Sequence, residues 1–149
     1  MSFDNLWDNI KEAQIVLPET IASLAIEGLN KKTLEMKKNL FFELYCETKE
    51  EFKRFELQLL APELGGYSLL VSVFNYPVAK IYPCTLYNCL DDNQVRNCVN
   101  SDDFEHGIRL ILGSEQMQNA IAALLSQCKE NAELEEHYVP KVYDDGLPF

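Results

Sequence analysis

Two histidines and five cysteines are the side chains in this sequence best suited to nucleophilic or metal chemistry. His106 could act as a base for Cys98 or Cys89, since a thiol needs a neighbouring base or a lowered pKa to become a nucleophile. Nothing in the spacing requires that pairing, and His137 lies in a segment without a core-forming pattern. The cysteines also lack a Cys-x-x-Cys pair. We therefore predict no catalytic site, no metal site and no cofactor, and we expect reduced, mostly buried thiols.

Adjacent carboxylates offer a second kind of chemistry. Asp91-Asp92 and Asp102-Asp103 could each hold Mg²⁺ together with a phosphate substrate. Neither pair is accompanied by a phosphate-binding loop, and Gly65-Gly66 is too short to serve as one. We interpret both pairs as solvated loop residues and predict that the protein is not an enzyme.

Aromatic side chains on a predicted strand suggest a surface for unpaired bases. Phe41 and Tyr45 alternate with Phe42 and Leu44, so they share one face of that strand. Aromatic rings beside basic groups form stacking platforms for single-stranded nucleic acid. The nearby basic residues are Lys37, Lys38, Lys53 and Arg54, with Lys31, Lys32 and Lys49 close to them. The alternative is that these lysines belong to a solvated helix end and a hairpin tip, and that the aromatic rings are half-buried by their neighbours.

The charge of the chain limits its partners. The formal net charge is −11, and from Glu130 onward six carboxylates stand against Lys141 alone. Binding to duplex DNA gains free energy when basic side chains displace counterions, so we expect no general affinity for duplex DNA. An acidic surface of this kind could instead block a basic partner, such as a nuclease, by imitating the charge of nucleic acid.

The last six residues, Asp144-Asp145-Gly146-Leu147-Pro148-Phe149, carry the most specific motif. They resemble the acidic tip of bacterial and phage single-stranded DNA-binding proteins, Asp-Asp-Asp-Ile-Pro-Phe. Leu147 replaces the isoleucine and Gly146 the third acid, and the likeness covers these six residues only. In the resembled family this tip docks on replication and repair enzymes, so the resemblance implies a partner of that kind.

The chemistry of such a tip supports docking. The Phe149 ring can enter a pocket, and its carboxylate, if the chain ends there, can meet a basic group at the rim. Pro148 lowers the cost of ordering the segment, while Asp144 and Asp145 steer it to a basic surface. We therefore expect a non-enzymatic accessory protein of DNA metabolism, whose body could also bind single-stranded DNA. The alternative is an inhibitor or immunity-type protein acting through its acidic surface.

Helices are predicted at the start of the chain. Apolar residues at helical spacing predict a helix over residues 2–16, with Trp7 on its apolar face. Pro18 suits the first turn of a second helix, which either ends near Asn30 or continues through Lys38. We expect this second helix to bury an apolar stripe formed by Ile21, Leu24, Ala25, Gly28 and Leu29.

Strands follow, because the apolar period changes to two at Asn39. The alternation predicts a strand over residues 39–47, a hairpin partner around residues 55–59 and a buried central strand over residues 67–74. Residues 78–90 give a fourth strand, placed at the sheet edge because Pro83 cannot donate a ladder hydrogen bond. Residues 91–100 are predicted to form a surface loop.

Two more helices complete the predicted domain. Asp102 and Glu105 have the spacing of a capping box, Gly113 ends the first of these helices, and Ser114 caps the second. The prediction is one α+β domain over residues 1–132, with two N-terminal helices, a four-stranded antiparallel meander and two C-terminal helices. A flexible acidic tail over residues 133–149 should follow.

The expected compartment is the cytoplasm. No apolar run is long enough to span a bilayer, and the N-terminus lacks the basic and apolar regions of a signal peptide. A homodimer through an exposed sheet face is compatible with these features, and we expect no membrane partner.

Overall fold

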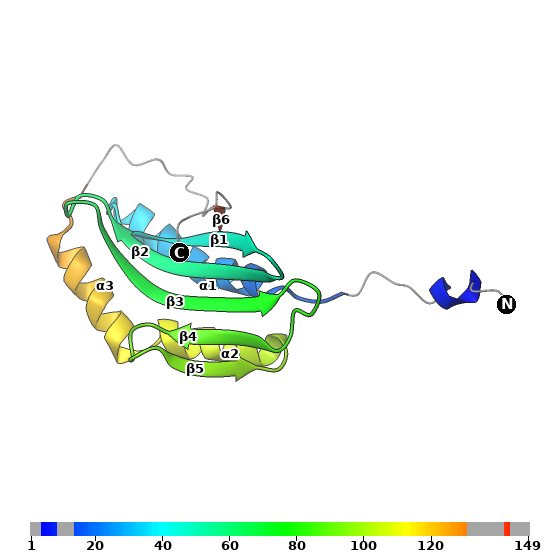
Figure 1. Ribbon diagram of the computed structural model, residues 1–149. Helices are drawn as coiled ribbons and strands as arrows, with labels where there is room; N and C mark the ends of the chain where they lie inside the picture. Colours follow the sequence, from blue (N-terminus) through cyan, green and yellow to red (C-terminus); the bar gives the residue numbers. More distant parts are fainter. Residues whose placement is uncertain (1–3, 9–13, 131–141, 144–149) are drawn as a thin grey trace.

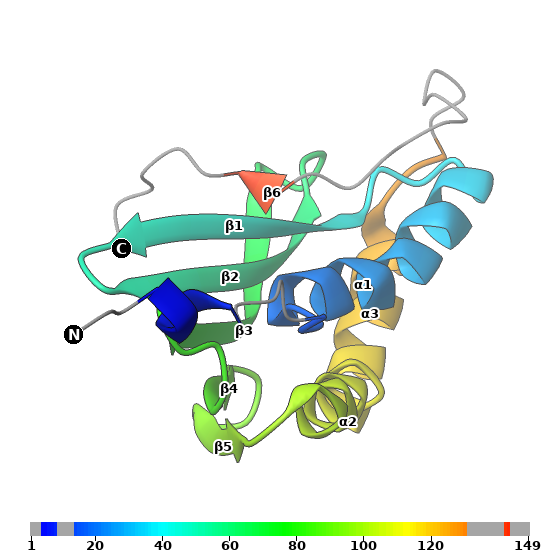
Figure 2. The same cartoon turned by 90° about the vertical axis from the view of Figure 1, so that its right-hand side faces the viewer.

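A computed structural model describes residues 4–8, 14–130 and 142–143 of the chain. Five antiparallel strands form a meander, and the α-helices lie together on one side of the sheet (Figures 1 and 2). This arrangement confirms the predicted α+β class. The strand order is β5-β4-β3-β2-β1-β6, and the two-residue strand β6 (Val142–Tyr143) lies parallel to β1.

The first two strands form where the alternation predicts them. They are β1 (Phe41–Lys49) and β2 (Phe52–Ala61), and they pair antiparallel with Leu44 opposite Leu57 and Cys46 opposite Phe55. All four of these side chains are buried beneath the helices. The period of two therefore sets the register, because a slip by one residue would turn every apolar side chain to the other face.

The remaining strands correct the prediction. Strand β3 (Tyr67–Pro77) is central as expected, but β4 (Cys84–Asn88) is short and lies inside the sheet. The edge is β5 (Gln94–Cys98), within the segment predicted to be a loop. Asp92 and Asn93 adopt positive φ angles of 49° and 57°, which Asp and Asn tolerate in turns. This turn joins β4 to β5, although the sequence of β5 has no clear alternation.

The predicted N-terminal helix is wrong where the structure describes it. Residues 4–7 form one 3-10 turn, η1 (Asp4–Trp7), and residues 14–17 are not helical. The rest of the predicted helix, residues 1–3 and 9–13, lies outside the described residues. Trp7 is 67% exposed rather than buried on an apolar face. A short helix without a packing partner is marginal in water, which explains why periodicity alone is insufficient here.

Helix α1 (Pro18–Glu35) begins at the predicted proline, but it buries a different stripe. Its buried residues, Pro18, Ala22, Ile26, Asn30 and Thr33, repeat about every four positions. Leu24 is 65% exposed, and Ala25 and Gly28 are exposed too. Ile21 and Leu29 of the predicted stripe are partly buried against the core, whereas its other three members face away from it.

The last two helices, α2 (Ser101–Leu112) and α3 (Glu115–Gln127), occupy their predicted places. The Ser114 hydroxyl accepts a hydrogen bond from the Met117 backbone at 3.1 Å, which confirms the predicted cap of α3. The cap of α2 is Asn100 instead of Asp102, since the Asn100 side chain accepts a hydrogen bond from the Asp103 backbone at 2.9 Å. His106 is exposed on α2, as expected.

The core lies between the sheet and the helices. Phe74 joins its two sides, because its ring stacks on Phe55 at 4.8 Å and meets Phe104 edge-on at 4.9 Å. Four of the five cysteines are buried, and all five are free thiols, as predicted. The described residues thus support a folded unit without disulfides, while most of the predicted tail over residues 133–149 lies outside them.

Candidate docking sites on the sheet

The outer edge of β1 is completed by other parts of the chain. The Asn30 amide donates to the Phe42 carbonyl at 3.1 Å, and the Phe42 N–H donates to the Asn30 side-chain oxygen at 2.7 Å. Both backbone groups of Phe42 therefore point away from β2. Because alternate residues of an antiparallel strand point to the same side, the backbone groups of Leu44 point to this outer edge too.

Strand β6 adds to this edge two residues further along. Val142 lies opposite Leu44 and Tyr143 opposite Tyr45, in parallel register. The acidic tip follows Tyr143 directly in the sequence. The predicted partner-binding residues Asp144, Asp145, Leu147, Pro148 and Phe149 lie outside the described residues.

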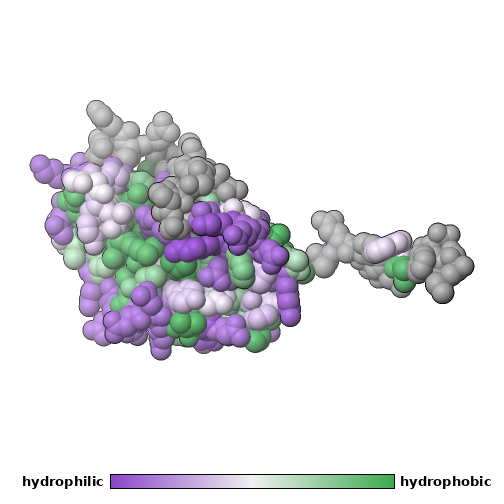
Figure 3. Space-filling view, viewed as in Figure 1, coloured by the Kyte–Doolittle hydropathy of each residue, from purple (hydrophilic) through white to green (hydrophobic). Residues whose placement is uncertain are grey.

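The sheet face opposite the helices, called here the outer face, presents one row across all five antiparallel strands. The row consists of Tyr45, Glu56, Val73, Tyr87 and Val95, paired in register. Figure 3 looks onto this side of the molecule and shows apolar patches between polar ones. The mixture of rings, apolar groups and carboxylates makes this face a candidate for contact with a macromolecule.

The predicted aromatic pair lies on the outer face with an acid between its members. Phe41 and Tyr45 are half-buried, and Glu43 between them is only 8% exposed. The Tyr45 hydroxyl donates to the Glu43 carboxylate at 2.6 Å. Glu56 beside them accepts hydrogen bonds from Arg54 at 2.7 Å and from Gln58 at 2.9 Å. The aromatic surface is therefore acidic, which disfavours the phosphates of a nucleic acid.

The predicted basic residues fall into two separate groups. Lys37 and Lys38 precede β1, whereas Lys53 and Arg54 lie at the opposite end of the β1–β2 hairpin. Thr48, which pairs with Lys53, lies seven positions after Phe41 in the extended strand, a length of about 23 Å. Lys38 also donates to the Cys128 carbonyl at 2.6 Å. The structure therefore brings Phe41 and Tyr45 onto one face but does not gather the four basic residues beside them.

A groove between α1 and α2 is a surface that the sequence analysis missed. Its volume is about 640 Å³. The lining residues are Val16, Ile21, Leu24, Ala25, Gly28, Glu105, Ile108, Arg109, Leu112 and Gly113. The signal in the sequence was the apolar stripe of α1, which we expected to be covered by the core and which faces this groove instead.

The side chains considered for catalysis are placed unfavourably for it. Burial raises the pKa of Cys98 to about 11, so this thiol stays protonated and weakly nucleophilic at neutral pH. His106 and the Asp91-Asp92 pair are exposed. Within residues 4–8, 14–130 and 142–143, no group of three or more His, Cys, Asp or Glu side chains is arranged to hold a metal ion.

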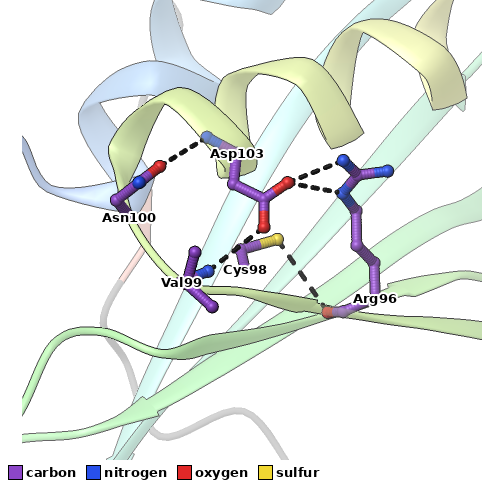
Figure 4. A network of polar contacts seen from close by, with 5 residues as sticks. All are labelled: Arg96, Cys98, Val99, Asn100 and Asp103. Atoms are coloured by element: carbon purple, nitrogen blue, oxygen red, sulfur yellow. Dashed lines mark hydrogen bonds and ion pairs between the residues drawn. The ribbon is translucent and has the colours of Figure 1, made fainter.

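Asp103, from the other predicted acidic pair, links β5 to α2 (Figure 4). One carboxylate oxygen accepts hydrogen bonds from Arg96 Nη2 at 2.6 Å and Nε at 3.1 Å, and the other accepts the Val99 N–H at 3.2 Å. The hydrogen bond from Arg96, followed by that from Val99, holds the pKa of Asp103 below its usual value. This geometry explains Asp103 as a structural residue at the start of α2.

Comparisons of the chain with protein-family models, with curated proteins and with solved structures gave no match. Among the described residues, no helix has the length and apolar character required to cross a membrane. The function of this protein is therefore inferred from the sequence of the tip and from the surfaces described above.

Proposed function

We propose that this protein is a non-enzymatic accessory protein of DNA metabolism that docks on a replication or repair protein through its acidic tip. Asp144, Asp145, Leu147, Pro148 and Phe149 would make the contact. The observation that supports this proposal is the parallel pairing of β6 with the edge of β1. In this pairing the residue before the tip, Tyr143, lies opposite Tyr45 of β1.

This attachment suits a docking segment. Within the described part of the chain, β6 pairs with β1 at two positions, Val142 with Leu44 and Tyr143 with Tyr45, and a pairing of this length involves few hydrogen bonds. A partner with a basic rim and an apolar pocket would attract Asp144 and Asp145 and then take the Phe149 ring.

A capture experiment tests the proposal. The intact protein, immobilised through its N-terminus, should retain replication or repair proteins from a bacterial lysate, and a variant lacking Phe149 should not. A six-residue peptide, Asp-Asp-Gly-Leu-Pro-Phe, should release them in excess, whereas the same peptide with Phe149→Ala should not. Leu110→Ala, at an exposed position of α2, is the matched control and should retain the same proteins. Equal capture by intact and shortened chains would remove the tip from the proposal.

Binding of single-stranded DNA by the body stays a prediction. If Phe41 and Tyr45 stack on bases, Phe41→Ala or Tyr45→Ala should weaken binding by about 1–3 kcal/mol per ring. The measurement is the anisotropy of a labelled oligonucleotide at several salt concentrations. Tyr67→Ala, at an exposed aromatic position at the start of β3, is the control. Absence of saturable binding at low salt would restrict the protein's role to protein docking.

The outer face favours a second candidate function, inhibition of a basic partner such as a nuclease. Glu43, Glu47 and Glu56 lie on this face, with Glu47 paired in register opposite Arg54. Their carboxylates would meet the basic site of such a partner. Removal of residues 144–149 should leave inhibition intact, whereas Glu47→Lys with Glu56→Lys should weaken it. The opposite pattern would favour docking by the tip.

A further inference from the structure

The groove between α1 and α2 exposes an apolar surface that has no partner in the arrangement described above. Leu24 and Val16, on its α1 side, are 65% and 50% exposed. Ile108, on its α2 side, is fully buried at the floor of the same groove. Exposed apolar area costs about 25 cal/mol per Å², and grooves of this size commonly hold a ligand or a peptide side chain.

The same chain carries a second exposed apolar element, the turn η1. In η1, Leu6 and Trp7 are 61% and 67% exposed. Figure 1 shows η1 at the N-terminal end of the chain, apart from the sheet and the helices. A tryptophan ring buries about 150–250 Å² when it enters a pocket, more than most side chains can. Contact between the two exposed apolar surfaces would therefore be favourable, because it buries apolar area.

We propose that Leu6 and Trp7 dock in the α1–α2 groove of their own chain. Trp7 lies nine positions before Val16, which itself lines the groove. Nine residues span at most about 30 Å, more than the segment needs to fold back along the first turns of α1. A short connection gives an effective concentration in the millimolar range, which favours the chain's own segment over a second copy.

Charge at the groove rim agrees with this occupant. Arg109 lies at the rim with its side chain 74% exposed, and its contact with Glu105 is long, at 3.6 Å. Asp8 follows Trp7 directly and is exposed. With Trp7 in the groove, the Asp8 carboxylate would reach the Arg109 guanidinium. The η1 turn of a second copy is a less suitable occupant of the groove. Each chain carries a net charge of −11, and like-charged chains repel.

The consequence is that the apolar surface between α1 and α2 has two states, covered and open. With the turn docked, the apolar face formed by α1 and α2 is covered, and with the turn released it is open to another apolar segment. This surface is formed by the helices and does not include the acidic tip, so the inference stands independently of the proposed function.

Fluorescence tests the inference directly, because Trp7 is the single tryptophan of the chain. The full-length protein should show blue-shifted emission relative to a peptide of residues 1–13. Its acrylamide quenching constant should be lower than that of the peptide, because a docked ring is less accessible to the quencher. Emission identical to that of the peptide would overturn the inference.

Two variants distinguish docking in the groove from a general effect of introducing a charge on the helices. Leu24→Lys should return emission and quenching to the values of the peptide, because it places a charge in the groove. Leu110→Lys is the matched control, since Leu110 is 54% exposed on α2 and does not line the groove. Far-ultraviolet circular dichroism and urea midpoints should agree for the two variants. No change in Leu24→Lys, or the same change in both variants, would overturn the inference.

Dilution tests whether the turn in the groove belongs to the same chain or to a second copy. Emission of the full-length protein should be constant over a hundredfold range of protein concentration, because docking within one chain does not depend on concentration. A red shift on dilution would assign the occupant to a second copy and would overturn docking within the chain.

Discussion

The side-chain amide of Asn30 in α1 pairs with both backbone groups of Phe42 in β1. Asn30 is 2% exposed, so both hydrogen bonds are shielded from water. The amide does at this position what a neighbouring strand would do, since it accepts from the N–H and donates to the carbonyl. It fixes α1 to the sheet edge next to the place where β6 pairs.

Asn30→Ala should therefore be strongly destabilising. The variant leaves the N–H and the carbonyl of Phe42 without their partner in a buried site, and each unsatisfied group costs about 1–3 kcal/mol. We expect the free energy of unfolding in urea to fall by about 2–4 kcal/mol. Asn119→Ala, at an exposed position of α3, is the control and should change it by less than about 0.5 kcal/mol. Equal effects of the two variants would contradict this role of Asn30.

Gly107→Ala should destabilise the packing of α2 on the sheet. A Cβ atom at this position would lie 2.7 Å from Leu86 Cδ2 and 2.8 Å from Arg96 Cδ. Overpacking of this kind typically costs about 1–3 kcal/mol, which exceeds the gain of up to about 1 kcal/mol from alanine's helix propensity. His106→Ala, at the preceding exposed position, should leave stability within about 0.5 kcal/mol. Urea unfolding measures both, and a Gly107→Ala variant more stable than the native chain would contradict the close contact.

The thiols should differ sharply in reactivity. Cys84 and Cys98 face each other across β4 and β5 with no exposed area, and burial raises the pKa of both. Cys89 is half-buried and is the most accessible of the five. At pH 8 we expect one fast reaction with Ellman's reagent and slow reaction elsewhere until the chain unfolds. Cys89→Ser should abolish the fast phase, and a fast phase that persists would show that a buried thiol is reactive.

Stability should decrease in alkali. Burial raises the pKa of Cys98 from 9.0 to about 11 and that of Tyr82 from 10.0 to about 12. A raised folded-state pKa gives a contribution that is complete below the unfolded-state pKa and is lost as the pH rises toward the folded-state value. Each group that ionises only on unfolding adds a slope of about 1.4 kcal/mol per pH unit. Urea unfolding between pH 8 and 11 should show this loss, and Cys98→Ala should reduce the slope between pH 9 and 11.

Acid should remove the contribution of Asp103. Its pKa is lowered by the hydrogen bond from Arg96, so its contribution is present above the unfolded-state value of about 4 and is lost as the pH falls through the lower folded-state value. Asp103→Asn should therefore be less stable than the native chain at pH 7, and the two should converge toward pH 2. Asp102→Asn, at the exposed neighbouring position, is the control. A constant difference between Asp103→Asn and the native chain across this pH range would show that the ion pair is not responsible.

Several elements were predictable because their signals are local. Pro18 starts α1 through its fixed φ and missing N–H, and Ser114 caps α3 through a hydrogen bond three residues away. The alternation of β1 and β2 predicted that they pair and which of their side chains share a face. Each of these signals depends on residues within a few positions of one another.

The predictions failed where contacts with residues distant in the sequence determine the local structure. Trp7 has helical apolar neighbours, but η1 is a single turn in which Trp7 is 67% exposed. Residues 94–98 lack alternation, yet they form β5 because β4 offers its free side for pairing. Asn30 was considered as a possible end of the second helix, but it lies within α1 and satisfies the Phe42 backbone twelve residues away.

The candidate sites divide in the same way. The sequence by itself determined the acidic tip, the net charge and the face shared by Phe41 and Tyr45, because these follow from residue types and from the strand period. Only the tertiary structure decided that Glu43 lies buried between those rings, that the lysines are divided between the two ends of the hairpin, and that α1 turns Leu24 to a groove. The physical reason is that a repeating pattern fixes which side chains share a face, whereas burial and charge at that face depend on what the rest of the chain places against it.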